Sequence, residues 1–258
     1  LKTGIYVDAE NIKMSGGYGM RYDVLVDLAK NTSSTLLRAN CYLAEDRERT
    51  SRDPDYRQKV YFYHNILRQC GFKIIKKYVR RYEDEDGNVT TKANADMDLA
   101  IDALLQARNL DKIILLTGDG DFIRLVTAMQ NMGCRVEVIG FHNVSRDLRE
   151  AADAFLSGFL IPGLLPFQEE NQDDEEGEWQ RGTVANFNAD RGFGFFRFYR
   201  MKNKELYPET VFFHLSKSTL EGDYYFQDST RIFEFRIIEN PSNEGRSEAW
   251  DIRLVRDS

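Results

Sequence analysis

The sequence has few cysteines and no long apolar run. Its 258 residues include three cysteines, Cys41, Cys70 and Cys134. Their odd number argues against a disulfide framework, and their wide spacing argues against a compact zinc site. No apolar run approaches the roughly 20 residues that cross a bilayer, and the first residues lack the basic-then-apolar layout of a secretory signal. These absences predict buried structural thiols, a cytoplasmic location and no membrane partner.

The net negative charge is confined to one short segment. Residues 169–178 contain seven acidic residues and no basic one, which equals the whole net charge of −7. Such a self-repelling stretch without apolar residues is typical of an extended linker. We therefore expect a first domain at 1–166, an acidic linker at 167–178 and a second domain at 179–258. Because the net negative charge lies in the linker, it does not exclude nucleic-acid binding by either domain.

The first domain alternates short apolar runs with amphipathic segments, which predicts an α/β fold with an open, mainly parallel sheet and flanking helices. Strands are expected near 4–8, 36–43, 73–77, 112–117 and 135–140. Helices are expected near 22–30, 54–70, 94–107 (with Asn94 as N-cap), 121–132 and 145–155. Residues 83–88 have the composition of an exposed hairpin tip.

Carboxylates gather around the predicted strand ends of this domain. Ligands bind off the carboxyl ends of parallel strands where the strand order reverses, so residues at two such ends can meet. Several ionised carboxylates share a pocket only with a cation or with shared protons, which predicts a divalent metal. A single Asp at a helix start is more often a cap, but separate groups at one sheet edge favour a metal. The six residues are Asp8, Asp96, Asp98, Asp102, Asp119 and Asp121.

Neighbouring polar residues could assist such a centre. The segment from Thr117 to Asp121, Thr-Gly-Asp-Gly-Asp, predicts a tight turn whose backbone N–H groups could hold a phosphate or orient a water molecule. Asn11 can act as a neutral oxygen ligand or bond a scissile phosphate, and Lys92 can neutralise charge nearby. His64 and His142 are expected to have structural or surface roles.

Three motifs of this domain resemble those of NYN domains, which belong to the PIN-like nuclease superfamily, and the likeness is greatest to the LabA-like branch. The motifs are Tyr6-Val-Asp-Ala-Glu-Asn-Ile12, Lys92 with Ala95-Asp-Met-Asp-Leu-Ala-Ile-Asp102, and Leu116-Thr-Gly-Asp-Gly-Asp-Phe122. The resemblance implies a PIN-like sheet and one or two Mg²⁺ or Mn²⁺ ions. It assigns the acidic positions to Asp8, Asp96, Asp119 and Asp121, with Asn11 and Asp98 in support. Thr117 stands where Ser is common, and either hydroxyl would serve.

In the second domain, the apolar residues recur in a pattern different from that of the first domain. Short aromatic and β-branched runs near 181–187, 193–199, 210–214, 230–238 and 247–255 predict a small closed antiparallel barrel. Alternate residues of a strand share a face, so Phe193 and Phe195 point the same way, as do Phe212 and His214. Bases can stack on such a row. The alternative is that these rings fill the barrel, but Val184, Phe196 and Phe213 are available for its interior.

This segment resembles a cold-shock domain, an OB-type barrel that binds single strands. Gly192-Phe-Gly-Phe195 matches the first ribonucleoprotein motif, and Val211-Phe-Phe-His214 matches the second. Arg191, Arg197 and Lys217 are expected to contact phosphates. Ala185 and Asn186 stand where that family usually has Lys and Trp, so one cation and one strong stacking residue are absent.

Together these features predict a metal-dependent ribonuclease. The barrel would capture single-stranded RNA, or single-stranded DNA, which stacking does not distinguish. Asp8, Asp96 and Asp119 would be the main metal ligands, and Asp121 a ligand or a water-orienting group. The alternative is a catalytically inert RNA-binding regulator, and a phosphatase is disfavoured because a small substrate needs no stacking surface. The pattern leaves homodimer formation open, and the basic residues Lys73, Lys76, Lys77, Arg80 and Arg81 could line an RNA path or simply be solvated.

Overall fold

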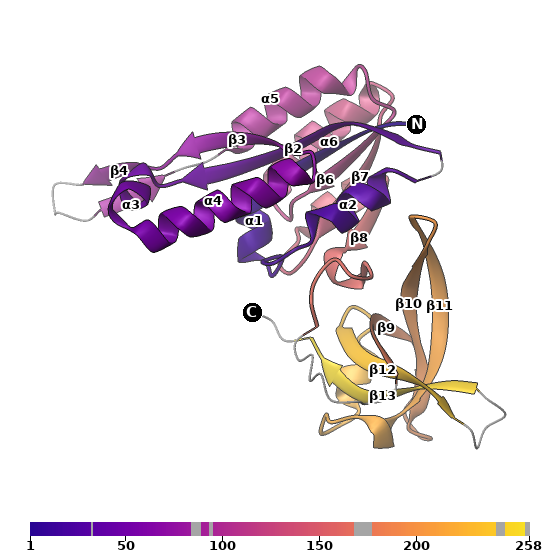
Figure 1. Cartoon of the computed structure of the whole chain (residues 1–258). Coiled ribbons are helices and arrows are strands. Elements are labelled where there is room, and N and C mark those ends of the chain that lie inside the picture. The colour runs from indigo at the N-terminus through magenta and orange to yellow at the C-terminus, as the bar shows by residue number, and fades with distance from the viewer. Residues whose placement is uncertain (32, 84–88, 93–94, 168–176, 241–245, 256–258) are drawn as a thin grey trace. The chain divides into compact units, whose positions relative to one another are not determined.

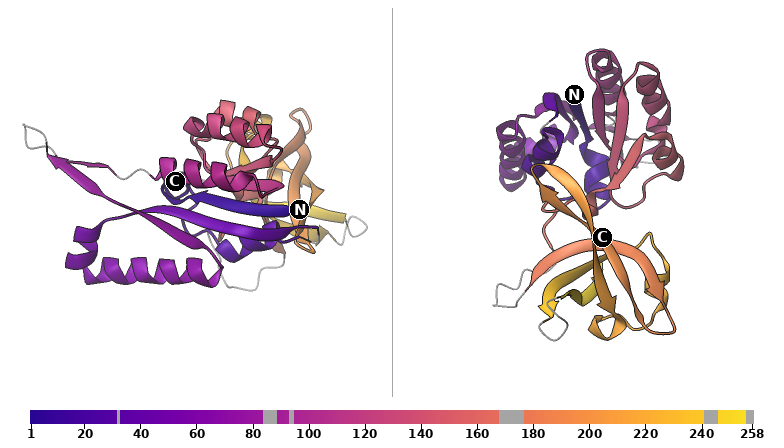
Figure 2. Two further views of the ribbon diagram at one scale, coloured as in Figure 1. Left: turned by 90° about the horizontal axis from the view of Figure 1, so that it is seen from above. Right: turned by 90° about the vertical axis from the view of Figure 1, so that its right-hand side faces the viewer.

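The computed structural model describes residues 1–31, 33–83, 89–92, 95–167, 177–240 and 246–255. The chain divides into two compact units, Leu1–Ser157 and Gly158–Ser258, which are drawn in Figures 1 and 2. All three cysteines are free thiols; Cys41 and Cys134 are buried and Cys70 is half-buried. Among the described helices, none is both long enough and apolar enough to cross a membrane.

The first unit is built on a six-stranded sheet whose neighbouring strands all run parallel. The strands are β1 (Lys2–Asp8), β2 (Thr35–Glu45), β3 (Lys73–Tyr78), β6 (Lys112–Leu116), β7 (Arg135–Gly140) and β8 (Ala154–Ser157). Their order across the sheet is β3-β2-β1-β6-β7-β8, so the chain reverses its direction of winding between β1 and β6. In parallel sheets this reversal opens a crevice at the carboxyl ends of the two strands.

Helices cover both faces of this sheet (Figure 1). One face carries α5 (Asp96–Ala107) and α6 (Ile123–Asn131), and the other carries α1 (Ala9–Met14), α2 (Tyr22–Ala29) and α4 (Pro54–Gln69), with α3 (Arg47–Arg52) before α4. Helix α7 (Arg146–Ala151) lies on the face of α5 and α6, because its Leu148 belongs to the same buried cluster. Leu99 of α5 and Val126 of α6 pack on Ile113 and Leu115 of β6, and all four are fully buried. Burial on both faces explains why β6 is a continuous apolar run instead of an alternating one.

The expected elements are present, with differences at their ends. The helix expected at 145–155 ends at Ala151, because the Asp153 backbone N–H donates to Val136 O (2.9 Å) and begins the pairing of β8 with β7. Helix α6 is preceded by a 3₁₀ turn, η1 (Gly120–Phe122). The expected cap Asn94 lies outside the described residues, and Ala95 is the N-cap of α5. Strands β4 (Arg80–Glu83) and β5 (Val89–Lys92) form the expected hairpin, whose tip, 84–88, is outside the described residues.

The second unit contains a closed five-stranded barrel. Its strands are β9 (Glu178–Asn188), β10 (Phe193–Lys202), β11 (Glu205–His214), β12 (Ile232–Asn240) and β13 (Arg246–Leu254). The circular order is β9-β10-β11-β13-β12, in which β11 and β13 pair in parallel and the other neighbours are antiparallel. The interior is filled by fully buried rings, with Phe196 stacked on Phe213 (centroids 4.2 Å apart) and on Phe235 (4.6 Å).

Short segments close the second unit. The 3₁₀ turns η2 (Gly158–Leu160), η3 (Leu215–Lys217) and η4 (Tyr224–Gln227) lie outside the strands, and Phe226 of η4 is buried against the barrel interior. Arg181 donates to the carbonyl oxygens of Leu165 and Pro166, at 3.2 and 2.6 Å, and its guanidinium lies over the Phe167 ring. The residues just before the acidic segment are therefore held on the barrel.

Candidate functional site

The carboxyl ends of β1 and β6 lie side by side, with Val7 in register with Leu116. Asp8 ends β1 and Thr117 follows β6, so the two side chains meet at the point where the strand order reverses. The Thr117 hydroxyl donates a hydrogen bond to Asp8 Oδ2 at 3.1 Å, and both residues are buried. The strand order thus brings together two residues that are 109 positions apart in the sequence.

Asp8 is an unusually placed carboxylate. It is 8% exposed, and its Oδ1 accepts the backbone N–H of Asn11 at 3.2 Å, which caps helix α1. Burial, together with the charges of Asp96 and Asp119, raises the pKa of Asp8 from 3.8 to about 6 against the lowering effect of its two hydrogen bonds. A carboxylate in such a place is stabilised by a cation or by a proton.

The turn after β6 is fixed by hydrogen bonds. Asn11 Oδ1 accepts the Gly118 N–H at 2.7 Å, and because that partner is a donor, the oxygen and nitrogen of the Asn11 amide are assigned. Thr117 Oγ1 accepts the Asp119 N–H at 3.2 Å, and Asp119 Oδ1 accepts the Asp121 N–H at 2.9 Å. A Cβ at Gly120 would lie 2.9 Å from the hydroxyl of Ser145, so this position favours glycine.

The predicted acidic residues divide into two groups. Asp8, Asp96 and Asp119 lie close enough for their charges to interact, and Asp121 is exposed beside them at the start of η1. Asp98 instead forms an ion pair with Lys77 (2.8 Å). Residues two apart on a helix point in nearly opposite directions, which explains why Asp96 and Asp98 have different partners.

Asp102 lies with Asp98 and not with the carboxylates of Asp8, Asp96 and Asp119. Its Oδ2 accepts the hydroxyl of Tyr42 at 2.9 Å, and both Asp98 and Asp102 line a hollow beside β3. Of the basic residues expected along an RNA path, Lys76 pairs with Glu45 (2.6 Å) and Lys77 with Asp98. The side chains of Lys92, Arg80 and Arg81 lie outside the described residues.

The donor set suits a hard divalent cation. Within the described ranges, no group of three or more His, Cys, Asp or Glu side chains converges closely enough to hold a metal ion. Carboxylate oxygens are nevertheless the ligands that Mg²⁺ and Mn²⁺ prefer. Burial, and to a smaller extent the charges of Asp96 and Asp119, raises the pKa of Asp8, and a bound cation would offset both effects. The chemistry of Asp8, Asp96 and Asp119 therefore fits such an ion.

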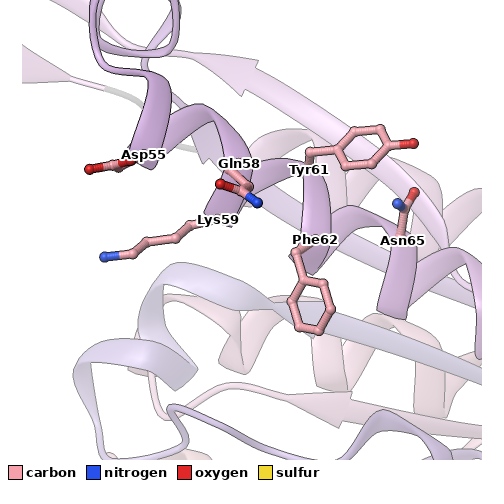
Figure 3. Close-up of a pocket in the computed structure, with 6 residues that line it drawn as sticks. All are labelled: Asp55, Gln58, Lys59, Tyr61, Phe62 and Asn65. Atoms are coloured by element: carbon pink, nitrogen blue, oxygen red, sulfur yellow. The ribbon is translucent and has the colours of Figure 1, made fainter.

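A hollow of about 550 Å³ lies elsewhere, along the outer side of α4 (Figure 3). Tyr61 and Phe62 line it and are 66% and 67% exposed. None of the predicted site residues lines it; the lining consists of Asp55, Gln58, Lys59, Tyr61, Phe62 and Asn65. His64, on the same helix, is buried with its Nε2 3.9 Å from a Glu45 oxygen, and His142 is half-buried.

The barrel carries a second candidate surface. Phe193 and Phe195 of β10 lie opposite His214 and Phe212 of β11, and these four side chains are partly or fully exposed. The Phe212 ring is 5.7 Å from each of the two β10 rings. Phe196, which follows Phe195, and Phe213, between Phe212 and His214, are the buried rings, so the interpretation that the first four rings fill the barrel is wrong.

Two basic residues predicted for this surface differ in their surroundings. Arg191 is exposed in the turn before β10. The Lys217 ammonium lies 3.3 Å from the centroid of the Trp250 ring. The sequence analysis did not single out Trp250, which lies in the strand expected at 247–255 and has no local signal of its contact with Lys217.

Comparison with known families identifies the first unit. The model of the NYN domain matches residues 2–163, more than half of the chain. The chain belongs to the NYN domain family. The low amplitude and bright protein LabA of Synechococcus elongatus is 28% identical over 97 residues, which cover 36% of this chain and 52% of that protein. The chain thus spans about half the length of this curated relative.

A solved structure gives a second comparison. The crystal structure of a protein of unknown function from Vibrio parahaemolyticus has 29% sequence identity and a TM-score of 0.48, covering 60% of this chain and 91% of that one. The NYN match includes Asp8, Asp96, Asp119 and Asp121 and ends before β9. NYN domains are typically nucleases of the PIN-like superfamily, so the match supports a nuclease-like or RNA-related function for the first unit.

Proposed function

We propose that this protein is a divalent-metal-dependent ribonuclease that hydrolyses phosphodiester bonds of single-stranded RNA. The observation that carries the proposal is the buried Asp8, whose pKa is raised to about 6 beside Asp96 and Asp119 at the strand reversal of an NYN domain. Strained acidic groups at this position are typical of sites prepared for a charged ligand and its chemistry.

In this proposal Asp8, Asp96 and Asp119 hold Mg²⁺ or Mn²⁺. When bound, such an ion supplies Lewis-acid activation of water and offsets the negative charge that develops at phosphorus. Asp121, exposed at the rim, accepts a hydrogen bond from the attacking water and aligns it. Because Asn11 uses its oxygen to accept the Gly118 N–H, its amide nitrogen is the atom that donates to a phosphate oxygen.

Thr117 and Lys92 complete the proposed site. The Thr117 hydroxyl donates to Asp8 and accepts from the Asp119 N–H, so it holds two ligands in a fixed relation. Lys92, in β5, offers a cation to the RNA backbone. We place Asp98 in a supporting role only, since its carboxylate is already paired with Lys77.

The barrel is proposed to be an OB-type, cold-shock-like domain that captures the single strand. Its strand order, with parallel pairing of the third and fifth strands, and its exposed Phe193, Phe195, Phe212 and His214 support this assignment. Arg191, just before β10, and Lys217, just after β11, would supply positive charge beside the aromatic row. Single-stranded DNA would stack on the same rings, so binding to both is expected.

A non-cleaving RNA-binding regulator is the second candidate. It is favoured by the fact that the carboxylates of the described residues do not converge at metal-ligand spacing. In that case Asp8 would keep its proton below about pH 6, the barrel would bind RNA, and no bond would be broken.

Cleavage of end-labelled, unstructured RNA by the purified protein separates the two candidates. We expect cleavage with Mn²⁺ or Mg²⁺, none with EDTA, and at least about a hundredfold less with Asp119→Asn. Asp23→Asn is the matched control, because Asp23 forms an exposed ion pair with Arg21 at the start of α2. Cleavage that survives Asp119→Asn would reveal a contaminating nuclease, and binding without cleavage under each metal would establish the regulator.

A further inference from the structure

The outer face of the barrel continues from β11 onto β13. Phe212 is in register with Glu248, and Phe213 is in register with Ala249. Phe213 and Ala249 are fully buried. Since side chains alternate along a strand, Trp250 lies on the outer face, on the side of β11 that is opposite to β10. Trp250 is partly exposed.

The row of outward-facing rings on β10 and β11 extends toward β13 and not toward β9. On the far side of β10, the β9 residues in register with Phe193 and Phe195 are Asn188 and Asn186, which have no ring. Among the described residues that flank these strands, Trp250 is therefore an aromatic residue placed to lengthen the row. Tryptophan offers the largest stacking area of any side chain.

Lys217 covers this indole in the protein without nucleic acid. Its ammonium lies 3.3 Å from the ring centroid, a cation–π contact. The Trp250 Nε1–H is shielded from solvent and has no hydrogen-bond partner in the part of the chain that the structure describes. A buried donor without a partner costs free energy in the protein without nucleic acid.

We propose that Trp250 is a base-stacking site and that Lys217 leaves its ring for a backbone phosphate when a base stacks there. This inference rests on the proposed capture of single strands by the barrel. Base stacking on an aromatic ring is worth more than an exposed cation–π contact, and the displaced ammonium gains a phosphate. Both halves of the exchange therefore favour the bound state.

The exchange predicts the path of the nucleic acid across the barrel. A single-stranded nucleic acid that stacks on Phe193 and Phe212 continues over Trp250, so it crosses β10, β11 and β13 in that order. The ligand is a single-stranded nucleic acid of either sugar, because stacking and a phosphate contact do not involve the 2′-hydroxyl.

Tryptophan fluorescence tests the proposal directly, because Trp179 and Trp250 are the two tryptophans of the chain. In the full chain with Trp179→Phe, an oligouridylate of about eight nucleotides, added in EDTA to prevent cleavage, should quench the remaining tryptophan. The quenching midpoint should equal the midpoint for binding of the same fluorescein-labelled oligonucleotide, measured by anisotropy.

Matched variants complete the test. Trp250→Ala should weaken binding about tenfold, and Lys217→Gln should lower the slope of log affinity against log salt by about 0.7. If Trp179→Phe does not fold, the difference in quenching between the natural sequence and Trp250→Phe gives the same information.

The outcomes distinguish this inference from the proposed function. Anisotropy that reports binding, lost with Phe212→Ala, without quenching of Trp250 would overturn the stacking role of Trp250 and leave capture by the barrel intact. No binding of the oligonucleotide by anisotropy would overturn both. Quenching together with an unchanged salt slope in Lys217→Gln would overturn the movement of Lys217 alone.

Discussion

The two units place their candidate groups by different geometric rules. In the α/β unit, Asp8 and the turn at Thr117 lie at strand ends, where parallel neighbours deliver residues from distant parts of the chain to one edge. In the barrel, Phe195 and Phe212 lie within strands and face outward because their neighbours Phe196 and Phe213 face inward. The site at the strand ends is buried, so charged groups can gather there. The site on the strand faces is open to solvent, so it provides a surface for contact with a ligand.

The difference has an energetic consequence. The buried Asp8 raises the free energy of the folded state, and its environment is defined by hydrogen bonds from Thr117 and Asn11. The exposed rings of the barrel cost the fold little beyond their hydration, while the buried rings beneath them supply its stability. In the first unit, the same residue, Asp8, serves the candidate site and destabilises the fold. In the barrel, exposed rings serve the candidate surface and the buried rings beneath them stabilise the fold.

The largest expected effect separates the two sides of the barrel strands. Phe196→Ala should destabilise the protein by about 3–5 kcal/mol, because the ring is fully buried and stacks on Phe213. Phe195→Ala is the matched control: its ring is 37% exposed, so it should cost much less stability. Chemical denaturation measures both, and equal losses would contradict the division between inner and outer faces.

The next effect concerns Asp8. Because its pKa is raised to about 6 in the folded state, the folded protein holds a proton that the unfolded chain releases, and stability falls as the pH rises from about 4 to 6. Asp8→Asn removes this loss. At pH 7 in EDTA it should therefore stabilise the protein by as much as about 3 kcal/mol.

Denaturation at pH 4 and at pH 7 tests this sign, with Asp23→Asn as the control on an exposed ion pair. Added Mg²⁺ or Mn²⁺ should stabilise the natural sequence more than Asp8→Asn, since the ion requires the carboxylate. Greater stability of the natural sequence at pH 7 in EDTA would show that Asp8 is not a strained group.

A smaller effect is expected on binding at the open surface. Phe212→Ala removes the ring that contacts both Phe193 and Phe195, and should weaken single-strand binding about tenfold while the rate of metal-dependent cleavage at saturating RNA changes little. Anisotropy and single-turnover cleavage measure the two quantities. A loss confined to the cleavage rate would contradict the separation of capture from chemistry.

The smallest expected effect is that of His64. Burial, followed by the charge of Lys76, lowers the pKa of this histidine, so the folded state resists its protonation and stability falls as the pH drops below about 6.5. This dependence opposes that of Asp8, so it should be measured in Asp8→Asn. His64→Gln in that background should flatten the stability profile between about pH 5 and 7, and an unaltered profile would contradict the assignment.

Much of the α/β sheet could be predicted from apolar runs, because a strand buried on both faces is a local property of the sequence. The edge strand β8 was missed since its four residues are half-buried and follow a helix without a strong break. Helices α1 and α3 were missed because each has six residues, too few to develop a clear period.

The candidate site was predictable to the same extent as the sheet. Asp8 and Asp119 follow apolar runs, so their place at strand ends could be anticipated. The orientation of Asp98 toward Lys77 could not, because it depends on how α5 lies over β3. The contact of Lys217 with Trp250 likewise depends on the parallel pairing of β11 with β13, two strands that are far apart in sequence.

The sequence by itself determined which residues are carboxylates, which rings alternate along a strand, and where each apolar strand ends, since these depend on local spacing. Only the tertiary structure decided that β1 and β6 are neighbours, that Asp8 is buried beside Asp96 and Asp119, and that Trp250 extends the aromatic row. The physical reason is that burial and charge coupling act through space. Their strength depends on distances that chain order does not fix.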